Sequence, residues 1–314
     1  MNERPSLPEI DQSPQIIAFD AVMPAAMAVR AEEAGVRRAA MDPITVFVLS
    51  VLAGAFISFG AAFSTTVGAG IVVMTAQDGA AVYSGALPYG LVRLFVGASF
   101  SIGLILVVVA GAELFTGNNL IVMAWASGRV KARAVLANWV IAFTGNAVGC
   151  LATAALMFVS TQYTFAGGAV GLNALAIANA KAALPFVPAL TLGIMCNALV
   201  CLTVWMCFGA RTTIDRVITI VPPITAFVTT GFEHSIANIY FIPLALFIKS
   251  NAPASFWASL GKTPADFPAV TWDNFLIGNL LPVTIGNIIG GSLMVGAVYW
   301  FVYLRKRAPS DAIV

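Results

Sequence analysis

The segments Glu113-Leu-Phe-Thr-Gly-Asn118 and Glu233-His-Ser-Ile-Ala-Asn238 each interrupt a long apolar run with a carboxylate, small or hydroxyl side chains and an amide. A carboxylate at the middle of a membrane helix costs about 2.5–3.5 kcal/mol even on the most lenient insertion scale. Two such interruptions are therefore unsuited to a lipid-facing surface. They indicate a polar pathway inside a membrane protein.

The residues that follow these two segments repeat as well. Sixteen positions after each glutamate comes a cation, Arg129 in the first case and Lys249 in the second. Each half also carries an asparagine followed seven positions later by a Gly-Asn-x-x-Gly block. These are Asn138 with Gly145-Asn146-Ala-Val-Gly149, and Asn279 with Gly286-Asn287-Ile-Ile-Gly290. The matching predicts two homologous repeats, at about 41–160 and 186–304.

The two repeats differ in length. Their glutamates are 120 positions apart and their asparagines 141, so the second repeat holds 21 additional residues between Lys249 and Asn279. We expect these residues to form a longer extracytoplasmic loop.

Composition places the chain among membrane proteins. Hydrophobic residues make up 60% of it and charged residues 10%, whereas soluble domains have about 45–50% and 25%. Six apolar runs reach the roughly 20 residues that a spanning helix needs. They lie at about 44–73, 90–127, 135–160, 186–209, 217–248 and 275–303. We expect an all-α integral membrane domain over 41–308, with six transmembrane helices of which the second and fifth are broken.

The distribution of cations predicts the orientation, because loops that stay in the cytoplasm accumulate Lys and Arg. Six spans put both termini on one side, and twelve of the sixteen Lys and Arg residues fall there. The other side has Arg93, Lys181, Lys249 and Lys262. Both termini are therefore expected in the cytoplasm, in a multi-pass protein of the inner cell membrane. Three spans per repeat invert the second repeat relative to the first, as in many transport proteins with broken helices.

The segments outside the spans have simple interpretations. We expect no signal peptide, since a basic start followed by an apolar core and a cleavage site is missing. Residues 1–15 are expected to form a polar cytoplasmic tail, and the amphipathic stretch up to Ala40 a helix in the cytoplasmic interface. A packing arm against a neighbouring subunit fits this stretch nearly as well. A second short cytoplasmic tail is expected at 309–314.

Several other classes of function lack their signatures. The four cysteines lie inside predicted spans without a Cys-x-x-Cys spacing, and we interpret them as packing residues. Metal, haem, phosphate-loop, dinucleotide and hydrolase motifs are missing, so we expect neither a cofactor nor enzymatic activity. Basic runs are too short to suggest nucleic acid binding.

The polar residues at the interruptions have a structural interpretation. A helix is broken at membrane depth where protein groups or pathway water satisfy the freed backbone donors and acceptors. Glu113 and Glu233 can accept hydrogen bonds from exposed amides of the opposing half. Four asparagines offer donors and acceptors for the same bracing: Asn118, Asn146, Asn238 and Asn287.

His234 is the single histidine of the chain, and it directly follows the second glutamate. Its imidazole changes charge near physiological pH. A histidine on an apolar face is commonly a satisfied core residue. This one, however, lies within an intramembrane interruption, and its counterpart in the other repeat falls near Phe115-Thr116. We therefore predict that His234 lies on a transport pathway.

Four separated stretches carry a family resemblance. They are Ala112-Glu-Leu-Phe-Thr116, Ser127-Gly-Arg129, Gly231-Phe-Glu-His-Ser-Ile-Ala-Asn238 and Pro282-Val-Thr-Ile-Gly-Asn-Ile-Ile-Gly-Gly291. They resemble, in order and spacing, the signature segments of the formate/nitrite transporter family, and most of all its formate-channel branch. The resemblance extends over about 21–307. It implies an aquaporin-like six-helix protomer that assembles as a homopentamer in the lipid bilayer, with one pore per subunit.

The resemblance also implies roles at the centre and on the cytoplasmic side. A small anion would be hydrogen-bonded between Thr116 and His234 at mid-membrane, with Phe115 beside the pair. Leu104 and Leu114 would form the cytoplasmic constriction.

On the periplasmic side the resemblance implies a second constriction and a polar vestibule. Phe100, Val200 and Phe227 would form the constriction. Lys181 and Asn197 would draw an anion into the vestibule or hydrogen-bond near the histidine. From their positions at the two breaks, Glu113, Glu233, Asn238 and Asn287 are expected to give the pathway its polar support.

The function implied is permeation of a small monovalent anion, passive or coupled to a proton, with formate as the expected substrate. Nitrite and hydrosulfide stay open as alternatives, because family members that conduct them share the Thr and His arrangement. A channel for neutral solutes would share the inverted repeat but would not call for a vestibule lysine.

Overall fold

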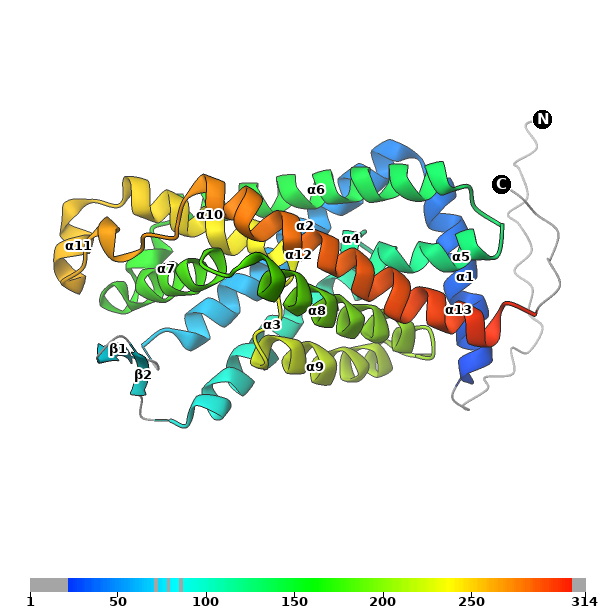
Figure 1. Cartoon of the computed structure of the whole chain (residues 1–314), viewed down its shortest axis with the longest axis horizontal. Coiled ribbons are helices and arrows are strands. Elements are labelled where there is room, and N and C mark those ends of the chain that lie inside the picture. Colours follow the sequence, from blue (N-terminus) through cyan, green and yellow to red (C-terminus); the bar gives the residue numbers. More distant parts are fainter. Residues whose placement is uncertain (1–21, 71–72, 78–79, 85–86, 307–314) are drawn as a thin grey trace, which may run out of the picture.

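The structure, a computed structural model, is a bundle of helices with one short β-hairpin (Figure 1). It describes residues 22–70, 73–77, 80–84 and 87–306, so the predicted tails at 1–15 and 309–314 lie outside the described residues. The helices in chain order are α1 (Pro24–Ala40), α2 (Pro43–Gly68), α3 (Tyr89–Ala110), α4 (Phe115–Asn118), η1 (Asn119–Ile121), α5 (Val122–Ala126), α6 (Ala132–Val159), η2 (Gln162–Thr164), η3 (Ala166–Gly168), α7 (Ala169–Ala182), α8 (Phe186–Cys207), α9 (Thr213–Thr229), α10 (Ser235–Asn251), α11 (Ala254–Leu260), η4 (Pro264–Asp266), η5 (Asn274–Leu280), α12 (Leu281–Ile288), η6 (Ile289–Ala297) and α13 (Val298–Tyr303). The strands β1 (Val73–Gln77) and β2 (Ala80–Ser84) pair antiparallel.

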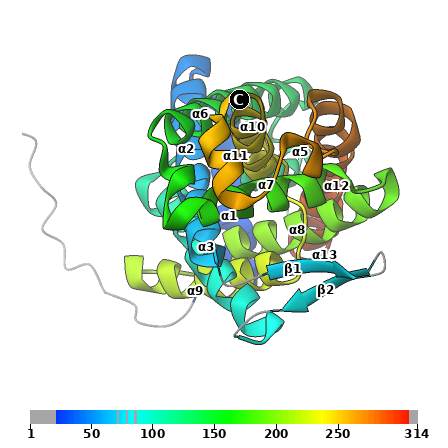
Figure 2. The same ribbon diagram turned by 90° about the vertical axis from the view of Figure 1, so that its left-hand side faces the viewer.

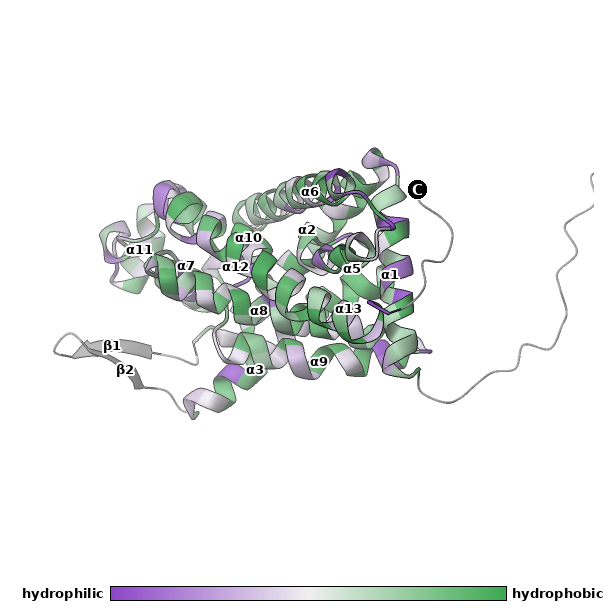
Figure 3. Ribbon diagram, turned by 45° about the vertical axis from the view of Figure 1, so that its right-hand side comes forward, coloured by the Kyte–Doolittle hydropathy of each residue, from purple (hydrophilic) through white to green (hydrophobic). Residues whose placement is uncertain are grey.

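The helices confirm the expected membrane architecture. Five described helices are long and apolar enough to cross a membrane, namely α2, α3, α6, α8 and the continuous helix Asn274–Tyr303. The remaining predicted span is divided between α9 and α10. Apolar residues dominate these helices, and hydrophilic residues gather on α1 and around α11 (Figure 3). The first span ends at Gly68 and not near residue 73, because the chain there leaves the helix for the hairpin.

Both predicted helix breaks are present and have the same backbone geometry. α3 is followed by Gly111, which has a φ of 77°, and α4 begins at Phe115. α9 is followed by Gly231, with a φ of 78°, and α10 begins at Ser235. A positive φ is accessible without strain to glycine. Glycine therefore lets the chain turn out of the helix at each break.

The two repeats pack through equivalent contacts. α2 packs against α3 and α6, and α8 packs against α9 and α12. A side-chain carbon at Gly149 would lie 2.0 Å from Val51 O, and one at Gly290 would lie 2.1 Å from Ile194 O. The repeated glycines therefore permit a close helix approach that a larger residue would prevent.

Each repeat is preceded by a short helix that extends the similarity. α1 precedes the first repeat, and α7, which the sequence analysis did not predict, precedes the second. Arg38 and Lys181, in the last turns of these helices, lie 143 positions apart, as do Leu49 and Leu192 of α2 and α8. Figure 1 shows α1 and α7 at opposite ends of the bundle, as two inverted repeats require.

The 21 additional residues of the second repeat form a folded cap over α7. Lys249 Nζ donates to Phe267 O at 2.9 Å and to Val270 O at 3.0 Å. Ala269 N–H donates to Asn179 Oδ1 of α7 at 2.9 Å. Figure 2 views this end of the bundle, with α11 in front. The cap thus ties the insertion to the helix that carries Lys181.

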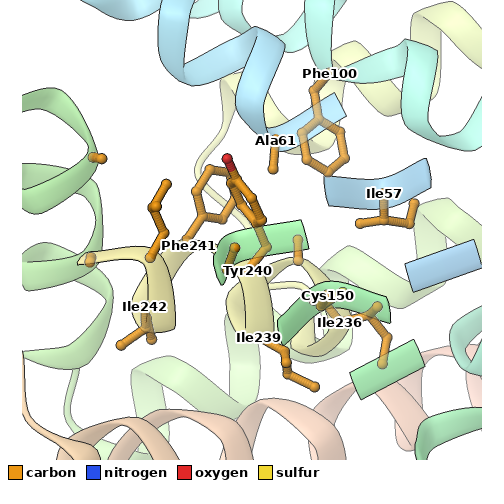
Figure 4. Close-up of a cluster of buried hydrophobic side chains, with 14 of the residues drawn as sticks. Ile57, Ala61, Phe100, Cys150, Ile236, Ile239, Tyr240, Phe241 and Ile242 are labelled. Carbon is orange, nitrogen blue, oxygen red and sulfur yellow. Dashed lines mark hydrogen bonds between the residues drawn. The ribbon is translucent and has the colours of Figure 1, made fainter. Parts of the chain in front are cut away.

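α10 lies at the centre of the apolar core. All of its residues from Ser235 to Leu246 are buried. Figure 4 shows side chains of α10 among those of α2, α3 and α6, with labels on Ile57, Ala61, Phe100, Cys150, Ile236, Ile239, Tyr240, Phe241 and Ile242. The four cysteines are buried and unbridged, in keeping with their interpretation as packing residues. This burial fixes the position of the second break.

Candidate transport pathway

Thr116 and His234 meet where the two breaks approach each other. Thr116 is the second residue of α4, and His234 caps the N-terminus of α10. Thr116 Oγ1 lies 3.0 Å from His234 Nε2, and the two residues are 0% and 3% exposed. The structure therefore places in contact the two residues that the resemblance paired, one from each half.

The hydrogen bonds around His234 define its tautomer. Nδ1 accepts from Ala237 N–H at 3.0 Å, so this nitrogen carries no proton in the described geometry. A neutral ring then holds its proton on Nε2, which donates to Thr116 Oγ1. The nitrogen that faces Thr116 is therefore a hydrogen-bond donor. A second proton on the ring would require the bond from Ala237 to break.

Asn197 holds Thr116 from the side of α8. Its Nδ2 lies 3.3 Å from Thr116 O and 2.6 Å from Asn287 O, so it connects the first break to the last span. Cys201 Sγ donates to the same Thr116 carbonyl at 3.2 Å. Asn197 is fully buried. Its contacts position Thr116, and its side chain does not line either of the two cavities described next.

One cavity, which we call the Arg38 vestibule, has a volume of about 220 Å³. Its lining includes Arg38 and Glu113, both predicted constriction residues Leu104 and Leu114, and Gly117, the neighbour of Thr116. The cavity therefore extends from charged groups near α1 to residues that flank the central pair.

A second cavity, the Lys181 vestibule, is smaller, at about 70 Å³. Lys181, Arg93, Phe100, Phe227 and His234 all line it. The Phe100 and Phe227 rings meet edge to face with centroids 5.6 Å apart, and the Phe227 ring lies 6.1 Å from the imidazole. This vestibule therefore reaches the central histidine past two aromatic rings.

One asparagine satisfies the freed backbone at each break. Asn146 accepts from Phe115 N–H at 2.9 Å and donates to Glu113 O at 3.0 Å and Ser50 O at 2.8 Å. Asn287 makes the same three bonds in the second half, at 2.9, 3.0 and 2.8 Å, with Ser235 N, Glu233 O and Gly193 O. The breaks therefore have the partners that a non-helical backbone needs at membrane depth.

The glutamates bind side chains of their own half. Glu113 accepts from Asn118 Nδ2 at 2.7 Å and forms an ion pair with Arg38 at 3.2 Å. The second half repeats these contacts at 2.7 and 2.8 Å with Glu233, Asn238 and Lys181. This differs from the expected acceptance from backbone amides of the opposing half. The difference arises because Asn146 and Asn287 already occupy the freed groups at the breaks.

Two residues that the resemblance assigned to the pathway lie in the core. Phe115 packs edge to face against Trp139 and Phe143, with centroids 6.3 and 5.2 Å away. Val200 of α8 is 2% exposed. Neither lines the Arg38 or the Lys181 vestibule.

Three arginines at the vestibules were not recognised as site residues from the sequence. Arg38 pairs with Glu113, Arg93 lines the Lys181 vestibule, and Arg216 lines the Arg38 vestibule. The sequence assigned them to sides of the membrane through the distribution of cations. The local sequence does not indicate in which direction an arginine side chain points. Their positions at the vestibules, and the ion pair of Arg38 with Glu113, were therefore visible only in the structure.

Comparison with known proteins identifies the family. The sequence model described as Formate/nitrite transporter matches residues 25–301. The chain belongs to the formate/nitrite transporter family. The predicted family is thereby confirmed, and membership makes the chain a multi-pass membrane protein of a family of channels and transporters.

Individual relatives of this formate/nitrite transporter family member match along most of their length. The chain is 45% identical to the formate channel FocA of Escherichia coli (strain K12), over 92% of this chain and 97% of the relative. It is 36% identical to the formate channel FocA of Haemophilus influenzae, over 85% and 89%. A solved structure of a pentameric formate channel with formate bound superposes with a TM-score of 0.75 at 42% identity, covering 84% of this chain and 98% of that one.

Proposed function

We propose that the chain forms a channel for formate and that Thr116 and His234 are the centre of its pathway. The observation that carries this is the 3.0 Å contact between the two side chains, in the interval between two vestibules. Two polar residues buried to this extent at a double helix break are expensive in a membrane unless function requires them. The relatives named as formate channels support the choice of substrate.

Apolar residues on both sides of the pair oppose the passage of a bare anion. Transfer of an unpaired charge from water to a medium of low dielectric constant costs many kcal/mol. Leu104 and Leu114 form the constriction on the Arg38 side, and Phe100 and Phe227 form the one on the Lys181 side. Phe115 and Val200 lie in the core behind these residues and line neither vestibule. An anion therefore needs a donor at the centre.

His234 supplies that donor from Nε2. With the neutral ring, formate accepts a hydrogen bond from Nε2–H in place of Thr116 Oγ1. When the ring also carries a proton on Nδ1, the Nε2 proton passes to a formate oxygen, and the ring keeps its Nδ1 proton. The permeant then crosses the apolar constriction as neutral formic acid. This step requires Ala237 N–H to leave Nδ1, so α10 must loosen at its first turn.

The surrounding polar residues hold this geometry. Asn197 fixes the carbonyl of Thr116, and Asn287 braces the break that presents His234. The cation that lines each vestibule is also paired with a glutamate whose carboxylate binds an asparagine. These two groups are Arg38 with Glu113 and Asn118, and Lys181 with Glu233 and Asn238.

The same proposal extends to assembly and orientation. We assign a homopentamer with one pathway per subunit, supported by the pentameric relative. Apolar side chains exposed on the long helices, such as Val140 at 66% and Val159 at 73%, would meet lipid or a neighbouring subunit. The channel domain, 41–308, would lie in the inner cell membrane with both termini in the cytoplasm, as the cation distribution indicates.

Uptake by liposomes that contain the purified protein tests the function. Formate should enter faster than lactate, acetate and glycerol, and faster than into liposomes without protein. Nitrite and hydrosulfide are measured in parallel, and a faster flux of either would reassign the substrate within the family. Rapid entry of glycerol with no formate flux would refute an anion pathway altogether.

A further inference from the structure

Lys181 and Arg38, the cations after which the vestibules are named, each form an ion pair with a glutamate. Each pair contributes almost no net charge to its vestibule. Lys181 Nζ lies 2.8 Å from Glu233 Oε1, and Arg38 Nε lies 3.2 Å from Glu113 Oε1. Two opposite charges this close act on a distant ion as a dipole, and the separate Coulomb interactions largely cancel. Attraction of an anion therefore has to come from another charge.

Arg93 is such a charge in the Lys181 vestibule. Its half-buried guanidinium donates to the carbonyls of Val228 and Thr229, at the end of α9. The ion pairs of the described residues do not include it. A helix C-terminus carries only about half of a negative charge. A net positive charge therefore remains at this mouth.

Arg216 holds the equivalent position in the Arg38 vestibule. It is half-buried in the first turn of α9, and within the described ranges it forms no ion pair. The carboxylate of the adjacent Asp215 accepts from Arg211 N–H at 3.0 Å and Thr212 N–H at 2.9 Å, which caps the helix. The helix N-terminus adds about half of a positive charge. Asp215 and Arg211 bring one negative and one positive charge to this end of α9, so Arg216 and the helix N-terminus leave the second mouth positive as well.

We infer that two arginines concentrate the permeant anion at the two mouths of the pathway: Arg93 of α3, beside the C-terminal end of α9, and Arg216, in the first turn of α9. The inference rests on the proposed anion channel and assigns its electrostatic entrances to these two arginines. A fixed charge in a vestibule with low-dielectric walls raises the local concentration of oppositely charged solutes. Removing either charge should lower formate permeability about three- to tenfold at low salt.

The effect of salt on formate permeability, measured with the salt on one face of the membrane at a time, distinguishes the roles of the two arginines. Membrane vesicles of uniform orientation are loaded or bathed with choline gluconate at about 0.01 or 0.15 M, with sucrose for osmotic balance. The Debye length shortens from about 30 to 8 Å over this range. Equal potassium concentrations with valinomycin hold the membrane potential at zero, and the influx of labelled formate gives the permeability.

The wild-type permeability should fall when salt is raised on either face. Arg93→Gln should lose the response at one face and Arg216→Gln at the other, while Arg93→Lys and Arg216→Lys keep both responses. Glutamine retains N–H donors for the end of α9, so the comparison with lysine isolates the charge. Lys262→Gln removes a cation that is 45% exposed and lines neither vestibule, and should keep both responses.

Two results would overturn parts of the account, and they are distinguishable. Intact salt responses at both faces in both glutamine variants would refute the assignment of the arginines, even though formate flux persists. Absence of formate flux through the wild type would refute the proposed function itself. If Arg93→Gln is not recovered as folded protein, Arg216→Gln carries the test, because no hydrogen bond of the described structure depends on the Arg216 side chain.

Discussion

Asn287 is predicted to be a main source of stability at the second break. Asn287→Ala removes two donated hydrogen bonds and one accepted bond, all to buried backbone groups. A net hydrogen bond contributes about 0.5–1.5 kcal/mol in proteins, and about 0.6 kcal/mol on average in membranes. Three of them give about 2–4 kcal/mol. For a chain of 314 residues, the melting temperature should then fall by roughly 3–6 °C.

Thermal unfolding of the purified protein in detergent measures this change. Asn146→Ala is the matched variant of the first break and should cause a similar shift, since its three bonds have the same lengths. Asn251→Ala is the control, because this exposed asparagine of α10 donates one bond, to Phe247 O. Shifts for Asn287→Ala and Asn146→Ala no larger than the shift for Asn251→Ala would refute the bracing role.

Three further predictions concern the constriction, the cap and the assembly. Phe227→Ala should admit lactate and acetate in the uptake assay, because it removes the ring beside His234. Phe59→Ala, at a residue that is 49% exposed, is the control and should keep the wild-type selectivity. Equal selectivity in the two variants would make Phe227 a packing residue. Lys249→Met should lower the melting temperature by removing the bonds to Phe267 and Val270, and an unchanged value would mean that the cap holds without them. Native mass spectrometry should give five subunits, and a stable monomer or trimer would contradict the homopentamer.

The polar breaks and the repeat were predictable from the sequence because membranes tolerate few polar residues. Asn146 follows Asn138 at the same distance at which Asn287 follows Asn279, in both cases within an apolar run. The equal spacing indicates that Asn146 and Asn287 have equivalent roles in the two repeats. Gly149 and Gly290 mark close helix contacts for the same reason. Such patterns predict the structure because the bonding partners of each residue lie in the same repeat.

Features that depend on distant contacts were not predictable. α7 has 14 residues and lies between two spans, so a search for runs of about 20 apolar residues passes over it. The ion pair between Lys181 and Glu233 joins residues 52 positions apart, and neither sequence neighbourhood indicates the other. The first apolar run was expected to continue to about residue 73, yet α2 ends at Gly68 and a hairpin begins at Val73. Tertiary packing decides such elements.

Proton movement that accompanies formate influx, compared between the wild type and His234→Asn, tests the central claim most directly. Vesicles that contain a pH indicator report protons while labelled formate is counted. The wild type should carry protons together with formate, with a flux that depends on pH. Asparagine keeps a donor toward Thr116 but cannot supply a proton, so the variant should fold, conduct formate without protons and lose the pH dependence. Proton-linked flux in His234→Asn equal to that of the wild type would contradict the account.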